Sequence, residues 1–143
     1  MKKYENQTTT NMAMGLAATI SMLKDSITGR AGRRPAGALP VEAMHTGDVV
    51  AQSETPRVTW FGHSAFLLQI EGKRLLFDPM LGSRPSPVSW AGTKRYSDRL
   101  PLAPKDFPEL DAIVISHDHY DHLDYDSIRT LMSKTLRFIV PLG

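Results

Sequence analysis

Ser116-His117-Asp118-His119-Tyr120-Asp121-His122-Leu123-Asp124 is a segment of nine residues that contains three imidazoles and three carboxylates. It directly follows Ala112 to Ile115, a short apolar run typical of a strand that is buried on both faces. Imidazole and carboxylate groups are ligands that suit zinc, manganese and iron. Because a solvated loop seldom concentrates both groups in this way, we interpret the segment as a metal site at the end of a strand.

The spacing within this segment predicts two neighbouring ion sites. Residues two apart in an extended chain point the same way, so His117 and His119 can bind one ion. If the chain turns into a helix after Tyr120, Asp121 and His122 are redirected toward a second ion. Two ions about 3.5 to 4 Å apart can hold a bridging hydroxide and stabilise the charge on the attacked group. The predicted chemistry is therefore hydrolysis.

Strands are predicted on both sides of the segment. The pattern upstream favours strands at residues 58–61, 65–70 and 74–77, the last two joined by a tight hairpin at Glu71-Gly72. Residues 79–108 contain six of the ten prolines, which predicts a long irregular surface loop. Downstream, residues 137–140 are expected to form a further strand.

A helix is predicted between the segment and that last strand. Asp124 is expected to cap it, and Ile128, Leu131 and Met132 are expected to share one of its faces. Asp124 could instead orient a ligating imidazole, as could Asp118; we favour the cap for Asp124.

Residues 1–56 are expected to form an N-terminal extension and linker, separate from a domain at 57–143. Apolar residues between Ala13 and Ile27 predict one short helix, which we expect to pack on the outside of the domain rather than dock on a membrane. Several glycines and prolines follow it.

Composition excludes several classes of protein. The chain has 143 residues, 41% of them hydrophobic and 22% charged, which is typical of one globular domain. A net charge of +2 is too small to indicate a nucleic-acid partner, and the absence of cysteine excludes thiolate sites. The apolar run at 12–23 is too short to span a bilayer and lacks the marks of a secretory signal, so we expect no membrane insertion and a cytoplasmic location.

The pattern His-x-His-x-Asp-His after an apolar strand resembles the signature of the metallo-β-lactamase superfamily. Further sequence motifs over residues 57–143 resemble the branch that contains N-acyl-phosphatidylethanolamine-hydrolysing phospholipase D. These motifs are Thr59-Trp60-Phe61-Gly62-His63-Ser64, Phe77-Asp78-Pro79-Met80, Gly92-Thr93-Lys94-Arg95-Tyr96 and Ile115 to Asp124. The bacterial lactonase of L-ascorbate 6-phosphate is a more distant relative.

The resemblance implies a fold and an activity. The fold is α+β, a metallo-β-lactamase-like αββα sandwich, of which residues 57–143 form the N-terminal half with mostly one sheet and flanking helices. The activity is that of a metal-dependent hydrolase that acts on a phosphodiester or related ester through a metal-bound hydroxide, with a small-molecule or lipid-like substrate. A lactonase of the same fold is an alternative.

The resemblance also implies the roles of single residues. His117 and His119 would bind the first of two divalent ions, and Asp121 and His122 the second; zinc is expected, with manganese or iron as alternatives. Asp121 would also help to manage the proton of the nucleophile. Asp78 matches an early aspartate that supports the metal loop through hydrogen bonds.

Four residues outside the metal set carry weaker expectations. His63 either lines the substrate pocket, for which we include it as a candidate catalytic residue, or is bonded to backbone at a strand end. Tyr120 is more readily interpreted as a buried loop tyrosine with an ordinary partner than as a donor to substrate. Lys94 and Arg95 resemble family positions, but a loop Lys-Arg pair is usually exposed charge.

One departure from the family pattern is expected to matter. The superfamily completes its site with later His and Asp ligands, whereas His45 and His63, the remaining imidazoles, both precede the signature. We therefore expect the sequence to be an N-terminal fragment, and the alternative to an enzyme is a catalytically inactive fragment or paralogue. Alone, such a chain would bind metal weakly, show no hydrolase activity and self-associate.

Overall fold

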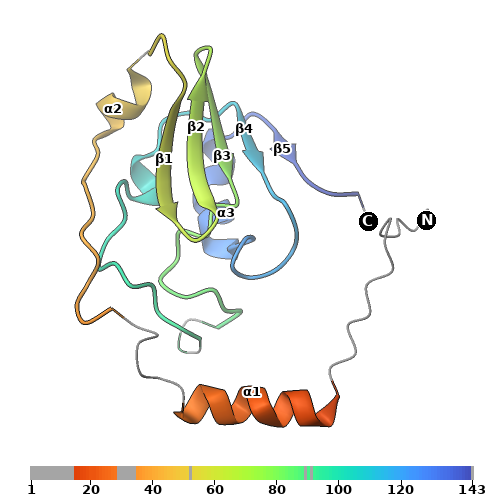
Figure 1. Ribbon diagram of the computed structural model, residues 1–143. Helices are drawn as coiled ribbons and strands as arrows, with labels where there is room; N and C mark the ends of the chain where they lie inside the picture. The colour runs from red at the N-terminus through yellow and green to blue at the C-terminus, as the bar shows by residue number, and fades with distance from the viewer. Residues whose placement is uncertain (1–14, 29–34, 52, 89, 91, 143) are drawn as a thin grey trace. The chain divides into compact units, whose positions relative to one another are not determined.

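The computed structural model describes residues 15–28, 35–51, 53–88, 90 and 92–142 (Figure 1). The chain divides into two compact units, one within residues 1–38 and the other at Leu39–Leu142. In the first unit, the predicted helix is confirmed as α1 (Leu16–Thr28), and its Leu16, Ile20 and Leu23 side chains are exposed. The second unit begins at Leu39, within the residues 1–56 that were predicted to form the extension and linker.

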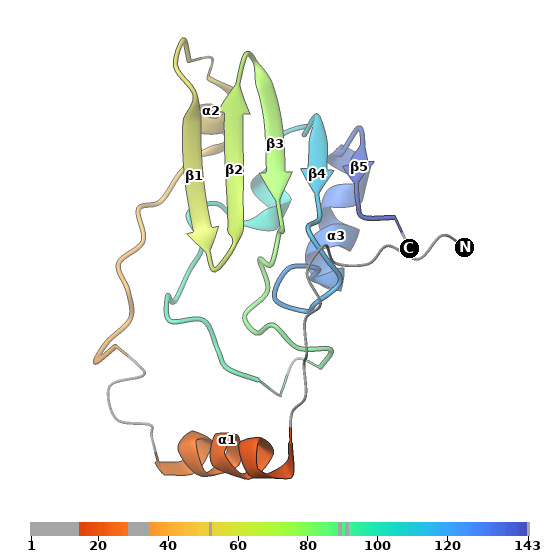
Figure 2. The same cartoon turned by 45° about the vertical axis from the view of Figure 1, so that its right-hand side comes forward.

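The second unit is built on a five-stranded sheet, ordered β1-β2-β3-β4-β5 (Figure 2). The strands are β1 (Arg57–Gly62), β2 (Ala65–Ile70), β3 (Lys73–Phe77), β4 (Ala112–Val114) and β5 (Phe138–Ile139). The first three pair antiparallel, and β4 and β5 add in parallel. All five predicted strands are confirmed. Glu71 and Gly72 both have positive φ, 49° and 72°, as a tight two-residue hairpin requires.

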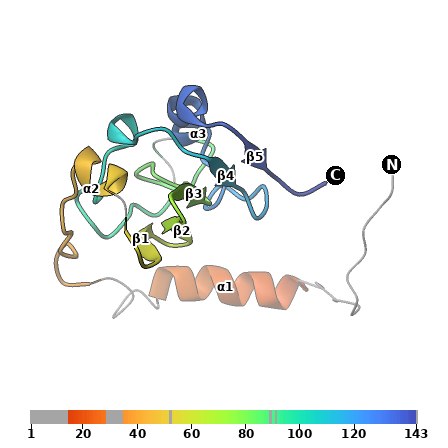
Figure 3. The ribbon, with the colours of Figure 1, turned by 90° about the horizontal axis from the view of Figure 1, so that it is seen from above.

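Helical segments cover one face of this sheet (Figure 3). They are α2 (Thr46–Val50), η1 (Pro104–Asp106), α3 (Tyr125–Leu131) and η2 (Met132–Lys134). The core lies between them and the sheet, because the fully buried side chains come from both layers: Val49, Leu67, Leu76, Phe107, Leu110, Ile113 and Leu131. The short helix α2 was not predicted. It forms because the Asp48 carboxylate accepts the His45 backbone N–H at 2.7 Å and Val49 completes the core.

One prediction about α3 is wrong. Asp124 does cap this helix, accepting a hydrogen bond from the Ser127 backbone, and Leu131 and Ile128 pack on the core. Met132, however, is 58% exposed. It begins the tighter turn η2, which rotates its side chain off the apolar face that the α-helical spacing predicted.

The other face of the sheet is apolar but only partly covered. Phe66 and Phe77 stack with their ring centroids 4.5 Å apart, and both are half-buried. Val58 and Trp60 on β1 are 62% and 64% exposed. Within the described residues, this unit therefore has two layers, a sheet and one set of helices.

The parallel pairing of β3 with β4 positions the segment that carries the histidines. Residues 78–111 connect these strands as a mostly irregular loop, as the prolines predicted, and Phe77 lies beside Val114. The chain therefore leaves both strands at the same edge, where ligand sites of open sheets commonly lie. No helix in the described part of the chain combines the length and apolar character needed to cross a bilayer.

Candidate metal centre

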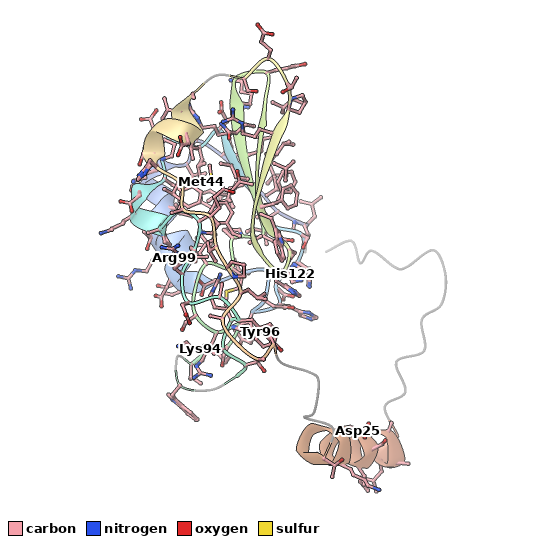
Figure 4. The ribbon with its side chains drawn as sticks, turned by 60° about the vertical axis from the view of Figure 1, so that its left-hand side comes forward. Asp25, Met44, Lys94, Tyr96, Arg99 and His122 are labelled. Atoms are coloured by element: carbon pink, nitrogen blue, oxygen red, sulfur yellow. The ribbon has the colours of Figure 1, made fainter. Side chains whose placement is uncertain are left out.

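Three segments meet at this edge of the sheet. They are the β1–β2 turn at 62–64, Asp78 at the end of β3, and the loop at 116–123 that follows β4. Figure 4 shows His122 at that end of the strands. His63 and Asp78 have positive φ values of 48° and 41°. Side-chain-bearing residues adopt this region at a cost of about 1 to 3 kcal/mol, and such strain often lies at functional sites.

Asp78 is the hydrogen-bonding centre of the cluster. Its Oδ1 accepts the Ser116 backbone N–H at 2.7 Å, and its Oδ2 accepts from the Ser116 hydroxyl at 2.8 Å and from His122 Nδ1 at 2.9 Å. Burial raises the pKa of Asp78, but the hydrogen bonds from His122 and Ser116 outweigh burial and hold the pKa below its usual range. Asp78 is therefore a carboxylate that ties β3 to the loop.

These bonds determine which nitrogens of two imidazoles are left free. A carboxylate only accepts, so His122 Nδ1 carries a proton and Nε2 remains as a possible ligand atom. The Ser116 hydroxyl already donates to Asp78, so it accepts from His117 Nδ1 at 2.9 Å. The Nε2 of His117 is then free as well. Asp78 thus orients His122 directly and His117 through Ser116, as carboxylates commonly do for metal-binding histidines.

Two groups of possible ligands result, and they share one residue. His117, His119 and Asp121 form one group, and His63, Asp121 and His122 form the other; within each, the ligand atoms lie within 4.8 Å of one another. Imidazole nitrogens and carboxylate oxygens fit zinc, manganese or iron. The donor set therefore suits the divalent ions that the family resemblance implies.

His63 occupies a place that the spacing of the sequence did not predict. Its Nε2 lies 2.8 Å from Asp121 Oδ2, and its backbone carbonyl accepts the Trp60 indole N–H at 2.8 Å. His122 Nε2 lies 3.7 Å from the same oxygen of Asp121. Partial burial raises the pKa of Asp121, but its backbone amide and the neighbouring His122 and His63 together lower it below its usual range.

The remaining expected residues have other surroundings. Asp124 accepts from Ser127 and from the Gly82 backbone N–H at 3.1 Å, so its contacts are those of a helix cap that also holds a loop. Asp118 and His45 are exposed, and the expectation that Tyr120 is buried is wrong, because its side chain is 55% exposed. Reasoning from sequence also assigned no role to Ser64, whose hydroxyl lies 3.0 Å from His122 Nδ1. Its only signal was its position directly after His63.

A groove of about 930 Å³ opens beside the cluster. It runs along β1 and reaches His63 and Asp121 at one end. One wall is an extended strap at 39–44, held to the loop by bonds from Leu39 N–H to Tyr96 O and from Met44 N–H to Pro101 O. Figure 4 labels Met44 on the strap and Lys94 and Tyr96 on the loop. Much of the lining is apolar and includes Pro40, Val41, Met44, Val58 and Met80.

The chain is similar in sequence to known proteins. The chain is 40% identical over 107 residues to N-acyl-phosphatidylethanolamine-hydrolyzing phospholipase D 1 of Caenorhabditis elegans. The aligned residues make up 73% of this chain and 30% of that protein. It is 42% identical over 113 residues to an uncharacterised protein of Mycobacterium tuberculosis, covering 77% of this chain and 29% of that protein. The chain thus spans about three tenths of the length of these curated relatives.

A shorter similarity links the chain to proteins described as metal-dependent hydrolases. One, from Aeropyrum pernix, is 37% identical over 67 residues, which are 47% of this chain and 22% of that protein. Among solved structures, the diiron β-hydroxylase CmlA of Streptomyces venezuelae aligns at 24% identity with a TM-score of 0.47, covering 64% of this chain and 16% of that one.

A match to a known protein family covers the second half of the chain. Residues 73–143, which include β3, β4 and every histidine of the signature, match the family described as the Beta-lactamase superfamily domain. The mixed sheet with flanking helices agrees with the α+β fold expected from the resemblance. This chain belongs to the metallo-β-lactamase superfamily.

Proposed function

We propose that this chain forms the metal-binding part of a hydrolase that cleaves a phosphodiester or related ester. The observation that carries the proposal is that Asp121 belongs to both groups of possible ligands. Because Asp121 lies within reach of both groups, two ions held by them would lie near each other. When bound, a pair of divalent ions lowers the pKa of water and stabilises the charge of the attacked group.

Four residues of the chain would hold these ions, and others would support them. His117 and His119 would hold the first, and Asp121 and His122 the second. Asp78 supports them because it fixes the ring orientation of His122 and, through Ser116, of His117. Asp124 would contribute indirectly, since it caps α3 behind the loop and the hydrogen-bond partners of its carboxylate among the described residues are Gly82 and Ser127.

His63 and Asp121 would act on the reacting groups. His63 borders the groove and its Nε2 contacts Asp121, so it can orient that carboxylate while facing the substrate. Asp121 would accept or return a proton next to the bond that is broken. We assign His63 this orienting role rather than that of a ligand, because its Nε2 is bonded to Asp121 and His63 lies outside the His-x-His-x-Asp-His signature.

The substrate that we propose is lipid-like. Two observations support this choice: the groove beside His63 is largely apolar, and the C. elegans relative is named as a phospholipase D. A small net charge of +2 gives little support to a nucleic-acid substrate. We also propose that the metal is zinc and that the protein is located in the cytoplasm.

The test is metal analysis combined with an assay of the whole protein, by which we mean this chain with any further segment that its gene encodes. We expect about two divalent ions per chain and turnover of an acylated glycerophosphodiester that stops after chelation and returns with zinc or manganese. A lactone and a nucleic-acid diester serve as competing substrates. Preference for either would overturn the proposed substrate, and turnover that persists without metal would overturn the proposed function.

A further inference from the structure

Arg95 has surroundings that a surface arginine in a loop does not normally have. A guanidinium has five N–H donors, and that of Arg95 donates to backbone carbonyls. Nη1 donates to Phe61 O at 3.1 Å, Nη2 to Met80 O at 3.1 Å and to Gly82 O at 3.0 Å, and Nε to Gly82 O at 3.1 Å. The expectation that Arg95 is simply exposed charge is therefore wrong, because the side chain is half-buried and makes four hydrogen bonds to backbone carbonyls.

The acceptors belong to two segments that are distant in the sequence. Phe61 is near the end of β1, one residue before the turn that carries His63, whereas Met80 and Gly82 begin the long loop that follows Asp78. Gly82 is held from its other side as well, because its N–H donates to the Asp124 carboxylate at 3.1 Å. A Cβ at position 82 would approach that carboxylate oxygen to 3.1 Å, so glycine allows the close packing.

The same arginine lies on the groove that reaches the cluster. Ser83, Pro85 and residues 93–97 line the groove together with residues of β1, and Arg95 is hydrogen-bonded to the β1 residue Phe61. A planar guanidinium can satisfy carbonyls in several directions at once, which the single nitrogen of lysine cannot do in the same geometry.

We propose that Arg95 is a positioning residue that fixes the 80–97 loop against the end of β1 and so sets the fit of the substrate's apolar part in the groove. This inference rests on the proposed function in assuming that the groove receives substrate. Among the described residues, the side-chain hydrogen bonds of Arg95 go to the carbonyls of Phe61, Met80 and Gly82 rather than to the candidate ligands. Its removal should therefore change binding of substrate rather than the chemical step or the content of metal.

The experiment compares R95A and R95K with the matched control R84A in the whole, metal-loaded protein. Arg84 is an arginine of the same loop, but it donates to Gly92 O within the loop itself. Three quantities are measured: amide hydrogen exchange over residues 80–97, metal content, and KM and kcat for esters of increasing acyl length. The exchange and metal measurements need no turnover, so failure of this inference can be distinguished from failure of the proposed function.

For R95A we expect at least tenfold faster exchange over residues 80–97 and a KM raised about tenfold or more for the longest ester. We expect kcat within about threefold and unchanged metal content. R95K should lie between R95A and the wild type, and R84A should match the wild type. If R95A does not fold, R95K carries the same test. Exchange that is unchanged in the variant, or a loss confined to kcat or metal content, would overturn the proposal, as would R95K indistinguishable from the wild type.

Discussion

The two ends of the sheet use the same kinds of polar side chain in different ways. At the hairpin end, Asp111 accepts the Arg74 backbone N–H at 2.9 Å and Lys73 Nζ at 3.0 Å. Arg74 in turn donates to the carbonyls of Val49 and Glu109. At the other end, Asp78 and Asp121 face imidazoles instead.

The difference shows what separates a structural polar network from a site. At the hairpin end, the charged groups satisfy backbone groups and each other, so nothing converges on a common point. At the other end, Asp78 accepts a hydrogen bond from His122 Nδ1. Ser116, which donates to Asp78, accepts one from His117 Nδ1. The opposite nitrogens then remain available beside Asp121, the residue common to both ligand groups. Carboxylates at the two ends should therefore respond very differently to mutation.

The largest effect is expected from loss of a ligand. His117→Ala or Asp121→Ala in the whole protein should lower hydrolysis by several orders of magnitude, beyond the roughly 10 to 100-fold that loss of an outer hydrogen-bond partner costs. Circular dichroism should be unchanged, because both side chains are only partly buried and lie outside the core. Initial rates measured at fixed metal concentration test this, and near-wild-type turnover in either variant would refute the assignment.

Asp78→Asn should come next. An amide cannot accept from Ser116 N–H, Ser116 Oγ and His122 Nδ1 as a carboxylate does, so both imidazoles lose their orientation. We expect metal affinity and kcat/KM to fall about 10 to 100-fold. Metal affinity measured by competition with a chelator checks the result. Asp111→Asn, at the hairpin end, is the matched control and should leave both quantities unchanged.

A smaller change is expected at His63. His63→Ala should lower kcat/KM about tenfold, at the low end of the range for outer partners, because Asp121 loses one hydrogen bond while its other contacts remain. Metal stoichiometry should stay near two ions per chain. Loss of a complete ion in the variant would instead identify His63 as a ligand and contradict the orienting role.

Sequence patterns predicted the parts of this molecule whose signals are local. The alternating strands, the Glu71-Gly72 hairpin and the cap at Asp124 each depend on residues a few positions apart, and the structure has them all. The clustering of His117, His119 and Asp121 is local in the same sense.

Features that depend on distant partners escaped prediction. His63 meets Asp121 only because the β1–β2 turn and the β4 loop lie at the same edge of the sheet. Arg95 bonds to carbonyls, which every residue possesses, so no side-chain pattern could indicate its partners. Helix α2 has only five residues, too few for a periodic signal, and its buried Val49 reveals its packing only in three dimensions.

The smallest expected effect belongs to Asp111 and concerns stability rather than activity. The backbone hydrogen bond from Arg74 and the bond from Lys73 lower the pKa of Asp111 below its usual value. A carboxyl group whose pKa is lower in the folded state stabilises that state above its unfolded pKa, and this contribution is lost as the pH falls through the folded pKa.

Asp111→Asn should therefore cost about 1 kcal/mol or less at pH 7, since the pair with Lys73 is largely solvated. Urea unfolding should show that the difference from the wild type narrows steadily below about pH 4. Asp98→Asn, an exposed loop carboxylate, serves as the control. A difference that stays constant from pH 7 to the acid limit would mean that the carboxylate charge of Asp111 does not hold this end of the sheet together.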